Sequence, residues 1–301
     1  LFPGQGSQNA GMCLDFYNKF DSVKKNFEIV NRALGFPISD LILNGPEEKL
    51  KLTENTQPAI MVVGVSIFNV LNEKFNFKLE ESKFFAGHSL GEYTALVCAG
   101  ALSLEKAAYL LNERGKAMQE AAPEGSGAMT AILGMSIDEV EKEITLISKI
   151  GTCEIANDNS NAQIVVSGNK NAIESLNENL KKKRKKSIIL PVSAPFHCSL
   201  MKKAAEKMKE KIDKTIFKNP KTNVVSNVIA KEEINADKIK SLLVDQITSR
   251  VRWRESVIYM INKGVSNFIE IGPGKVLSGL VKKINRDVKI ININSLSDIN
   301  I

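Results

Sequence analysis

A serine bracketed by glycines constrains the fold of this chain more than any other feature. Residues 87–91 (GHSLG) follow a short apolar run, 83–87 (KFFAG), and a helical pattern begins directly after them. G-x-S-x-G between a strand and a helix is the sequence context of a nucleophile elbow, which exposes the serine at the start of the helix. Backbone N–H groups and the helix dipole can stabilise an oxyanion there. The pattern favours an α/β fold with Ser89 as a nucleophile; the alternative is a tight turn with a capping serine.

Length and composition are those of a globular protein with a large core. A chain of 301 residues suggests one large domain or two unequal ones, and 43% hydrophobic with 25% charged residues excludes a wholly disordered chain. The longest apolar stretch, 59–71, is shorter than the roughly 20 residues of a membrane span, so we expect no membrane association. The two histidines and four widely spaced cysteines predict neither a structural zinc site nor a disulfide framework.

The middle of the chain has its own order of elements. Its patterns run strand, helix, strand, strand, helix, strand, which is the ferredoxin-like βαββαβ order. A turn rich in Asn, Asp and Ser separates the two middle strands, and Pro123 with two nearby glycines marks a boundary. We therefore predict a small domain of residues 126–193 inserted into a larger α/β domain of residues 1–125 and 194–301. The strands are expected at 128–133, 152–156, 163–167 and 187–192, and the helices at 136–148 and 171–183.

A nucleophilic serine needs a base within hydrogen-bond reach, and the sequence offers two histidines. His88 is the neighbour of Ser89, and adjacent residues of an elbow point in different directions. His197 follows a predicted strand and a turn that contains Pro195, which suits a loop at the edge of the sheet. We therefore expect His197 to be the base. Since no Asp or Glu follows in an obvious orienting position, a backbone carbonyl is a candidate for orienting it.

Arg114 occupies an unusual position in a predicted helix that Ser103 can cap. At about 100° per residue it falls on the apolar side, next to Ala107 and Met118. A guanidinium there must be paired, because an unpaired buried charge costs several kcal/mol. The pattern leaves two alternatives equally open. One is a buried partner carboxylate, and the other is a substrate carboxylate, which the planar fork of arginine binds through two hydrogen bonds.

Basic side chains exceed acidic ones along the chain. The net charge is +7, and residues 181–186 form an unbroken basic run (KKKRKK). Such a run favours an anionic partner, such as nucleic acid, anionic lipid, a phosphate-bearing cofactor or an acidic protein, and we expect it near the cleft between the domains. The alternative is a solvated helix end, where lysines suit the helix dipole, in a chain whose Lys and Asn usage reflects an AT-rich genome.

The opening segment, residues 2–8 (FPGQGSQ), is a glycine-rich loop that follows a short strand. It lacks the G-K-[ST] of a Walker motif and the G-x-G-x-x-G of a dinucleotide-binding turn. It is either a tight turn or a source of a backbone N–H donor near the oxyanion. The chain starts at Leu1 without a methionine, so we expect a trimmed start, which leaves a removed targeting peptide open.

Taken in order, these motifs resemble those of the malonyl-CoA:acyl carrier protein transacylases of type II fatty-acid synthesis and the related polyketide synthase acyltransferase domains. The resemblance covers essentially the whole chain. It implies an α/β-hydrolase-like large domain with an inserted ferredoxin-like small domain. It also implies malonyl transfer from malonyl-CoA to the phosphopantetheine thiol of acyl carrier protein, through a malonyl ester on Ser89. The matching motifs are FPGQGSQ at 2–8, GHSLGEY at 87–93, RGKAMQ at 114–119, PVSAPFH at 191–197, Gln246 ahead of VRW at 251–253, and IGPGKVL at 271–277.

The resemblance further implies a role for each central residue of the site. His197 acts as the base, and the backbone carbonyl of Gln246 orients it in place of a carboxylate. The backbone N–H groups of Gln5 and Leu90 form the oxyanion hole. Arg114 binds the malonyl carboxylate, so the resemblance favours the substrate alternative for this residue.

Three other residues and the partners follow from the same resemblance. Phe196 is expected to exclude branched acyl groups, because a bulky residue at this position accompanies malonyl choice in the related polyketide synthase domains. Asn159 and Lys186 fall where coenzyme A contacts lie in the family. We expect a monomer that uses no cofactor or metal and binds malonyl-CoA and acyl carrier protein, but no nucleic acid. The expected location is the cytoplasm of a bacterium or, as the Lys- and Asn-rich composition favours, the plastid or mitochondrial matrix of a eukaryote.

Two other functions fit parts of the pattern. A serine hydrolase or esterase would share the elbow and the histidine, but a neutral acyl group gives it no use for a buried Arg114. A non-catalytic protein that binds a carrier protein or nucleic acid would use the basic surface, but it would not need the Ser89 and His197 pair.

Overall fold

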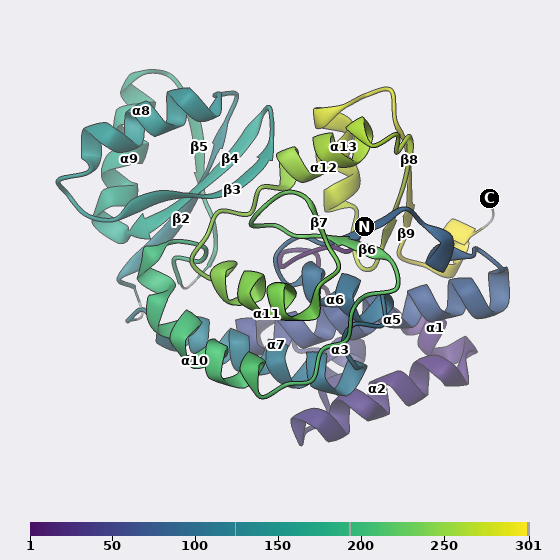
Figure 1. The fold of residues 1–301 in the computed structure, drawn as a ribbon. Helices are drawn as coiled ribbons and strands as arrows, with labels where there is room; N and C mark the ends of the chain where they lie inside the picture. The colour runs from purple at the N-terminus through teal and green to yellow at the C-terminus, as the bar shows by residue number, and fades with distance from the viewer. Residues whose placement is uncertain (124, 193, 300–301) are drawn as a thin grey trace.

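Short strands from separate parts of the chain form the central sheet of the larger unit, residues 1–123 and 194–299 (Figure 1). The pairs β1–β6 and β8–β9 are parallel, and β7 is antiparallel to β6. The computed structural model describes these residues together with 125–192. Residues 1–2 lie between two of the strands: the Phe2 N–H donates to the Ala86 carbonyl (2.9 Å), and the Ile271 N–H donates to the Leu1 carbonyl (2.9 Å). The turns that follow these parallel segments therefore meet at one edge of the sheet. The strands are β1 (Phe84–Ala86), β6 (Asn223–Val225), β7 (Glu232–Glu233), β8 (Asn267–Ile271) and β9 (Lys289–Ile293).

Two hydrophobic cores lie on the two faces of this sheet, because successive residues of a strand point to opposite faces. Phe85 and Val224 join the larger core, whereas Ala86 and Val225, the next residues along β1 and β6, join the smaller one. Residues of α12 and α13 complete the smaller core, and most other helices of the unit lie on the opposite side of the sheet (Figure 1). The sheet is thus covered on both faces, as parallel sheets require.

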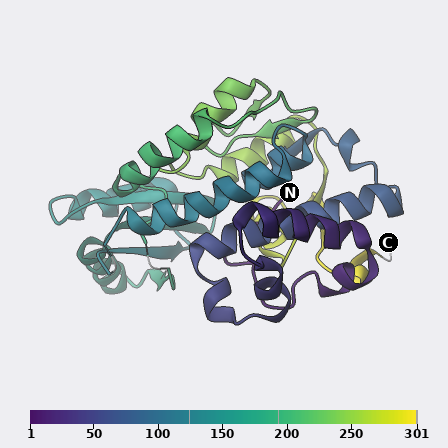
Figure 2. The ribbon, with the colours of Figure 1, turned by 90° about the horizontal axis from the view of Figure 1, so that it is seen from below.

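Helices make up most of the larger unit. Ser103 caps α7 as predicted, since its hydroxyl accepts from the Lys106 N–H (3.3 Å). Seen from below, α7 runs across the molecule and packs between α10 and α2 (Figure 2). The helices are α1 (Leu14–Lys19), α2 (Asp21–Leu34), α3 (Ile38–Asn44), α4 (Glu47–Leu50), α5 (Thr53–Phe75), α6 (Gly91–Cys98), α7 (Leu104–Glu120), α10 (Lys202–Asp213), α11 (Ala236–Asp245), α12 (Trp253–Asn262) and α13 (Val276–Ile284), with 3-10 turns at Leu79–Glu81, Ser199–Met201 and Leu296–Ile299.

The apolar stretch 59–71 lies in α5. By length and composition, α5 is the one helix of the described residues that could cross a membrane, yet 72% of its most apolar window is buried inside the structure. Val62, Val63 and Ile67 are fully buried in the larger core. Because it is apolar on nearly every side, α5 serves as a central core helix.

The smaller unit, residues 125–192, follows the predicted order of elements. Its strands pair antiparallel in the order β3-β4-β2-β5. α8 and α9 cover one face of this sheet, where they enclose a separate core (Figure 1). Ser136 and Glu139 form a capping box at the start of α8. The elements are β2 (Gly127–Leu133), α8 (Ile137–Ile147), β3 (Cys153–Ser160), β4 (Gln163–Asn169), α9 (Lys170–Lys182) and β5 (Lys186–Ile189).

One expectation for this unit is wrong. Most of the segment expected to be a polar turn is strand, since β3 continues to Ser160 and only residues 161–162 form the turn. These polar side chains are buried against the larger unit, where partners satisfy them. The Asp158 N–H donates to the Val251 carbonyl (2.9 Å), and the Arg254 guanidinium donates to the Asp158 carboxylate at 2.8–3.1 Å. Ser193, at the expected domain boundary, lies outside the described residues.

Candidate active site

Ser89 lies at the sharp turn between β1 and α6. Its φ of +53° is in the left-handed region, an uncommon conformation for a residue with a side chain. The two glycines of the motif are sterically required. A Cβ on Gly87 would lie 1.9 Å from the Gly91 backbone, and a Cβ on Gly91 would lie 2.3 Å from the Phe2 carbonyl oxygen. Glycine therefore allows β1, α6 and the opening segment to approach closely enough to expose Ser89 at the end of the helix.

The structure brings His197 to Ser89 and Gln246 to His197. The Ser89 Oγ and His197 Nε2 are 2.8 Å apart, and the His197 Nδ1 lies 2.8 Å from the Gln246 backbone oxygen. Because a carbonyl only accepts, Nδ1 carries the proton and Nε2 is free to accept from the Ser89 hydroxyl. Burial, and then the charge of Arg114, lower the pKa of His197 to about 3. The imidazole is therefore neutral at physiological pH and can act as a proton acceptor.

Arg114 of α7 reaches the same point from the other side. It is only 1% exposed, and its Nη2 donates to the Ser89 Oγ (3.1 Å) and to the Gln246 Oε1 (2.9 Å), while its Nη1 donates to the Gln57 Oε1 (2.6 Å). These partners are neutral oxygens, and the buried Nε has no hydrogen-bond partner among the described atoms. The guanidinium thus keeps donor capacity beside the Ser89 hydroxyl, where a carboxylate could use it.

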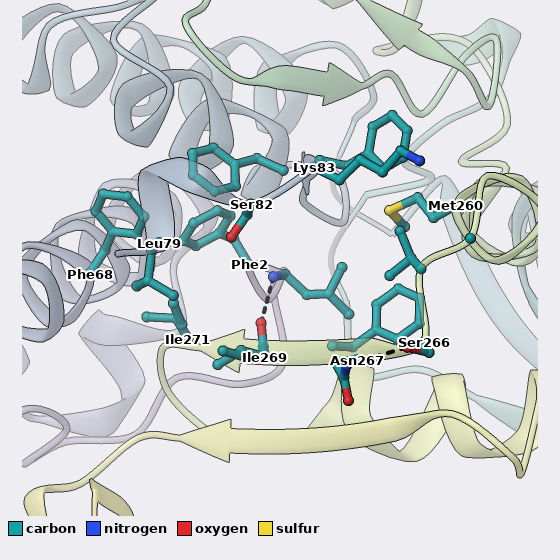
Figure 3. Close-up of a pocket in the computed structure, with 16 residues that line it drawn as sticks. Phe2, Phe68, Leu79, Ser82, Lys83, Met260, Ser266, Asn267, Ile269 and Ile271 are labelled. Atoms are coloured by element: carbon teal, nitrogen blue, oxygen red, sulfur yellow. Dashed lines mark hydrogen bonds between the residues drawn. The ribbon is translucent and has the colours of Figure 1, made fainter. Parts of the chain in front are cut away.

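A cavity of about 120 Å³ opens over these groups. Gln5, Leu90 and Phe196 line it together with Ser89, His197 and Arg114. A larger cavity, of about 340 Å³, lies between β1 and β8, where the Leu1 nitrogen donates to the Ile269 carbonyl (2.6 Å) (Figure 3). It is lined mainly by apolar side chains and includes none of the residues predicted for the site.

Three predicted residues and the basic run lie outside the cavity lining. Gln246 is buried behind His197 and Arg114, which it contacts. The Asn159 Oδ1 is 2.8 Å from the His88 Nε2, and Lys186 is exposed at the start of β5. The basic run is not next to the cleft as expected. Lys183 pairs with Glu143 and Lys185 with Glu139, both on α8, which covers the face of the small sheet away from the cavity. The reason is topological, because the run begins in the last turn of α9 and ends at the first residue of β5, so most of it lies with the helical layer.

Sequence reasoning missed the polar residues behind the site. The Asn227 Oδ1 accepts from the Ser89 N–H (2.7 Å), and the Asn227 Nδ2 donates to the Gly87 carbonyl (2.8 Å), which fixes the elbow. The Glu92 Oε2 accepts from the Gln246 Nε2 (2.8 Å) and the Asn227 N–H (3.0 Å). Burial raises the pKa of Glu92 to about 7, although these hydrogen bonds oppose the rise. Glu92 lies within the GHSLGEY motif, so its position was a signal, but nothing in the sequence indicates its contacts.

Metal chemistry has no evident site in residues 1–123, 125–192 and 194–299. They contain no group of three or more His, Cys, Asp or Glu side chains placed to hold a metal ion. All four cysteines are free.

Comparison with known proteins places this site in a family. The family description "Acyl transferase domain" matches residues 1–295. The "Malonyl CoA-acyl carrier protein transacylase" of Bacillus subtilis is 44% identical over 296 residues, which are 98% of this chain and 92% of that protein.

Solved structures agree with this placement. The acyl-carrier-protein-S-malonyltransferase of Bartonella henselae superposes with a TM-score of 0.96 at 42% identity, covering 99% of this chain and 95% of that one. A malonyl-transacylase solved in complex with its type II PKS acyl-carrier protein superposes with a TM-score of 0.95 at 39% identity, covering 99% and 96%. The two relatives with a stated organism are bacterial and give no support to an organelle of a eukaryote. The chain therefore belongs to the acyl transferase family, among the malonyl CoA-acyl carrier protein transacylases.

Proposed function

We propose that this protein transfers the malonyl group of malonyl-CoA to the phosphopantetheine thiol of acyl carrier protein, through a malonyl ester on Ser89. The observation that carries the proposal is the chain of contacts from the Gln246 carbonyl through His197 to Ser89. Arg114 adds a buried cation at hydrogen-bond distance from the same serine oxygen. The matched relatives carry names that describe this reaction.

The first half of the reaction forms the ester. The His197 Nε2 takes the Ser89 hydroxyl proton as the Oγ attacks the thioester carbonyl. The backbone N–H groups of Gln5 and Leu90 hold the negative oxygen of the tetrahedral intermediate. The C–S bond then breaks, and the coenzyme A thiolate leaves with the proton from His197. In the second half the carrier-protein thiol gives its proton to His197, attacks the ester, and restores Ser89.

Arg114 and Phe196 select the acyl group. The Arg114 guanidinium binds the malonyl carboxylate, for which two parallel hydrogen bonds give both affinity and orientation. Phe196 is 7% exposed, lines the cavity and precedes the base, so its ring crowds the acyl α-carbon and excludes branched groups. Contacts of Asn159 and Lys186 with coenzyme A follow from the family resemblance alone.

The organisation of the chain follows the same proposal. Residues 1–125 and 194–301 form an α/β-hydrolase-like catalytic domain, and residues 126–193 form a ferredoxin-like domain inserted into it. The sheet order β3-β4-β2-β5 supports the second assignment. The protein works as a monomer in the bacterial cytoplasm, requires no cofactor, and binds neither nucleic acid nor membrane.

Mass spectrometry of the intact protein after mixing with malonyl-CoA tests this function. The expected result is the mass of one malonyl group, located on Ser89 and lost when holo acyl carrier protein is added. The same experiment without carrier protein measures hydrolysis. An adduct that water removes as fast as the carrier protein does would identify a serine hydrolase instead. The absence of any adduct would contradict acyl transfer altogether.

A further inference from the structure

Glu92 is a buried carboxylate that the reaction above does not use. It lies in the first turn of α6, is 3% exposed, and accepts hydrogen bonds from the Gln246 side chain and the Asn227 backbone. Burying a carboxylate is costly, and removing its partners would make it more so. Its side chain does not line the cavity, so any effect on the reaction has to pass through one of these partners.

The carboxylate fixes the orientation of the Gln246 side-chain amide. The Glu92 Oε2 acts as an acceptor, since it also accepts from the Asn227 N–H, so the NH₂ of Gln246, and not the amide oxygen, faces it. The amide oxygen is thereby turned to the opposite side, where it accepts from the Arg114 Nη2 at 2.9 Å. A flipped amide would direct its NH₂ at the guanidinium, which has no acceptor. The Gln246 Nε2 also donates to the Ser89 carbonyl at 3.2 Å, but its hydrogen bond to Glu92 is the shorter one, at 2.8 Å. Glu92 is thus the main group that sets the amide orientation, and Arg114 uses that orientation at the other end.

The Gln246 amide also connects two buried ionisable groups, Glu92 and Arg114. The hydrogen bonds of Arg114 go to the neutral oxygens of Gln57, Ser89 and Gln246, and the Gln246 amide links one of them to the Glu92 carboxyl group. Hydrogen bonds polarise one another in such a chain, and in a low-dielectric interior the effect is larger than in water. The Arg114 guanidinium is therefore held by the dipole of the Gln246 amide, whose other end is hydrogen-bonded to the Glu92 carboxyl group.

We propose that Glu92 is a positioning residue that acts through the Gln246 amide to hold Arg114 in place for the substrate carboxylate. The inference rests on the proposed malonyl transfer and deepens it by naming what aligns the carboxylate-binding group. The contact to His197 is separate, because it uses the Gln246 backbone oxygen and not the side chain. Glu92 therefore affects recognition of the carboxylate more than the acylation step itself.

The test compares malonyl-CoA with acetyl-CoA in single-turnover acylation of Ser89 by wild type and Glu92→Gln. Glutamine fills the same space and keeps one accepting oxygen, but its own NH₂ lets the Gln246 amide flip. We expect the malonyl-to-acetyl ratio of kcat/KM to fall about tenfold, the order of one hydrogen bond to a charged group. Acetyl transfer should change at most about threefold. Glu92→Asp, which keeps an acceptor-only end, should retain a ratio closer to that of the wild type.

A double-mutant cycle with Gln246→Ala isolates the route, since alanine removes the amide and leaves the backbone carbonyl for His197. The Glu92→Gln effect on the ratio should disappear in the Gln246→Ala background. Additive effects, or equal losses for both acyl groups, would overturn the inference and indicate a purely structural role. If Glu92→Gln does not fold, Gln246→Ala alone decides, and an unchanged ratio overturns the inference. If the wild type forms no malonyl ester, the proposed function itself is wrong. If the wild type forms the ester but the variants keep the same malonyl-to-acetyl ratio, only this inference is wrong.

Discussion

Two groups of positive charge, the buried Arg114 and the exposed run at 181–186, differ in what surrounds them. Arg114 is 1% exposed and held by three hydrogen bonds. Lys181 and Lys182 extend into solvent, and Lys183 pairs with a carboxylate of α8. A charge in a low-dielectric site interacts far more strongly than one in water, where exposed pairs contribute about 0–1 kcal/mol. The single buried arginine should therefore matter more to function than six adjacent cations at the surface.

The largest expected effect comes from removing the Ser89 hydroxyl, the proposed nucleophile, while the Arg114 cation stays in place. Ser89→Ala should abolish the malonyl adduct and reduce transfer by about 10⁴-fold or more, because no other group of the site can carry the acyl ester. Intact-mass analysis and a transfer assay measure this, and the melting curve serves as the control for folding. A stable malonyl adduct on the alanine variant would show that a residue other than Ser89 carries the acyl ester.

Arg114→Ala tests the buried side of the comparison directly. Losing one partner of a buried, hydrogen-bonded charge pair costs roughly 2–5 kcal/mol, which is about 30- to 4,000-fold in malonyl transfer. Acetyl transfer should fall much less, because an acetyl group has no carboxylate for the guanidinium. Arg114→Lys is the matched control, since it keeps the charge without the planar fork. Equal losses for malonyl and acetyl substrates would mean that Arg114 is structural.

The pH dependence of stability tests the surroundings of the buried Arg114, because burial and then the charge of Arg114 lower the pKa of His197. The pKa of His197 is about 3 in the folded protein and about 6.5 in the unfolded chain. Between these pH values His197 is protonated only in the unfolded chain. The free energy of unfolding therefore falls as pH drops below about 6.5. From pH 7 to pH 5 the wild type should lose about 2 kcal/mol more unfolding free energy than His197→Gln. Urea titrations at both pH values measure the difference. Parallel losses in the two proteins would show that His197 titrates normally.

The order of elements and the turn that carries Ser89 could be predicted from sequence, whereas the polar network could not. Periodicity and glycine spacing are local signals, so the order of elements in residues 125–192 and the strand–Ser89–helix turn were predictable. The contacts of Asn227 and Glu92 join segments more than 130 residues apart, and no local pattern encodes them. The prediction of a turn at the polar end of β3 was wrong for the same reason. The side chains there find their hydrogen-bond partners in Arg254 and other residues distant in sequence.

Phe196→Ser is expected to change selectivity rather than overall activity. The smaller side chain frees space beside the acyl α-carbon, and one methyl group in an apolar pocket is worth roughly 1–3 kcal/mol. The methylmalonyl-to-malonyl ratio should therefore rise about tenfold, with Arg114 still binding the shared carboxylate. Phe196→Leu, which keeps most of the bulk, is the control. An unchanged ratio in the serine variant would remove Phe196 from the specificity assignment.

The smallest expected effect belongs to the exposed run. An acidic carrier protein would be attracted to residues 181–186 over a distance that salt limits to about 8 Å at physiological ionic strength. The run lies on the helical layer, away from the cavity where the thiol must react, so steering by it adds little to the encounter. Replacing Lys181, Lys182 and Lys183 with glutamine should raise KM for the carrier protein by at most about twofold at low salt. Neutralising Lys19 of α1 together with Lys24 and Lys25 of α2, all exposed or half-buried, removes the same three charges and gives the matched control for net charge. A much larger rise in KM for the run variant than for the control, removed by added salt, would contradict this expectation. It would show that solvated surface charges can matter as much to function as the buried Arg114.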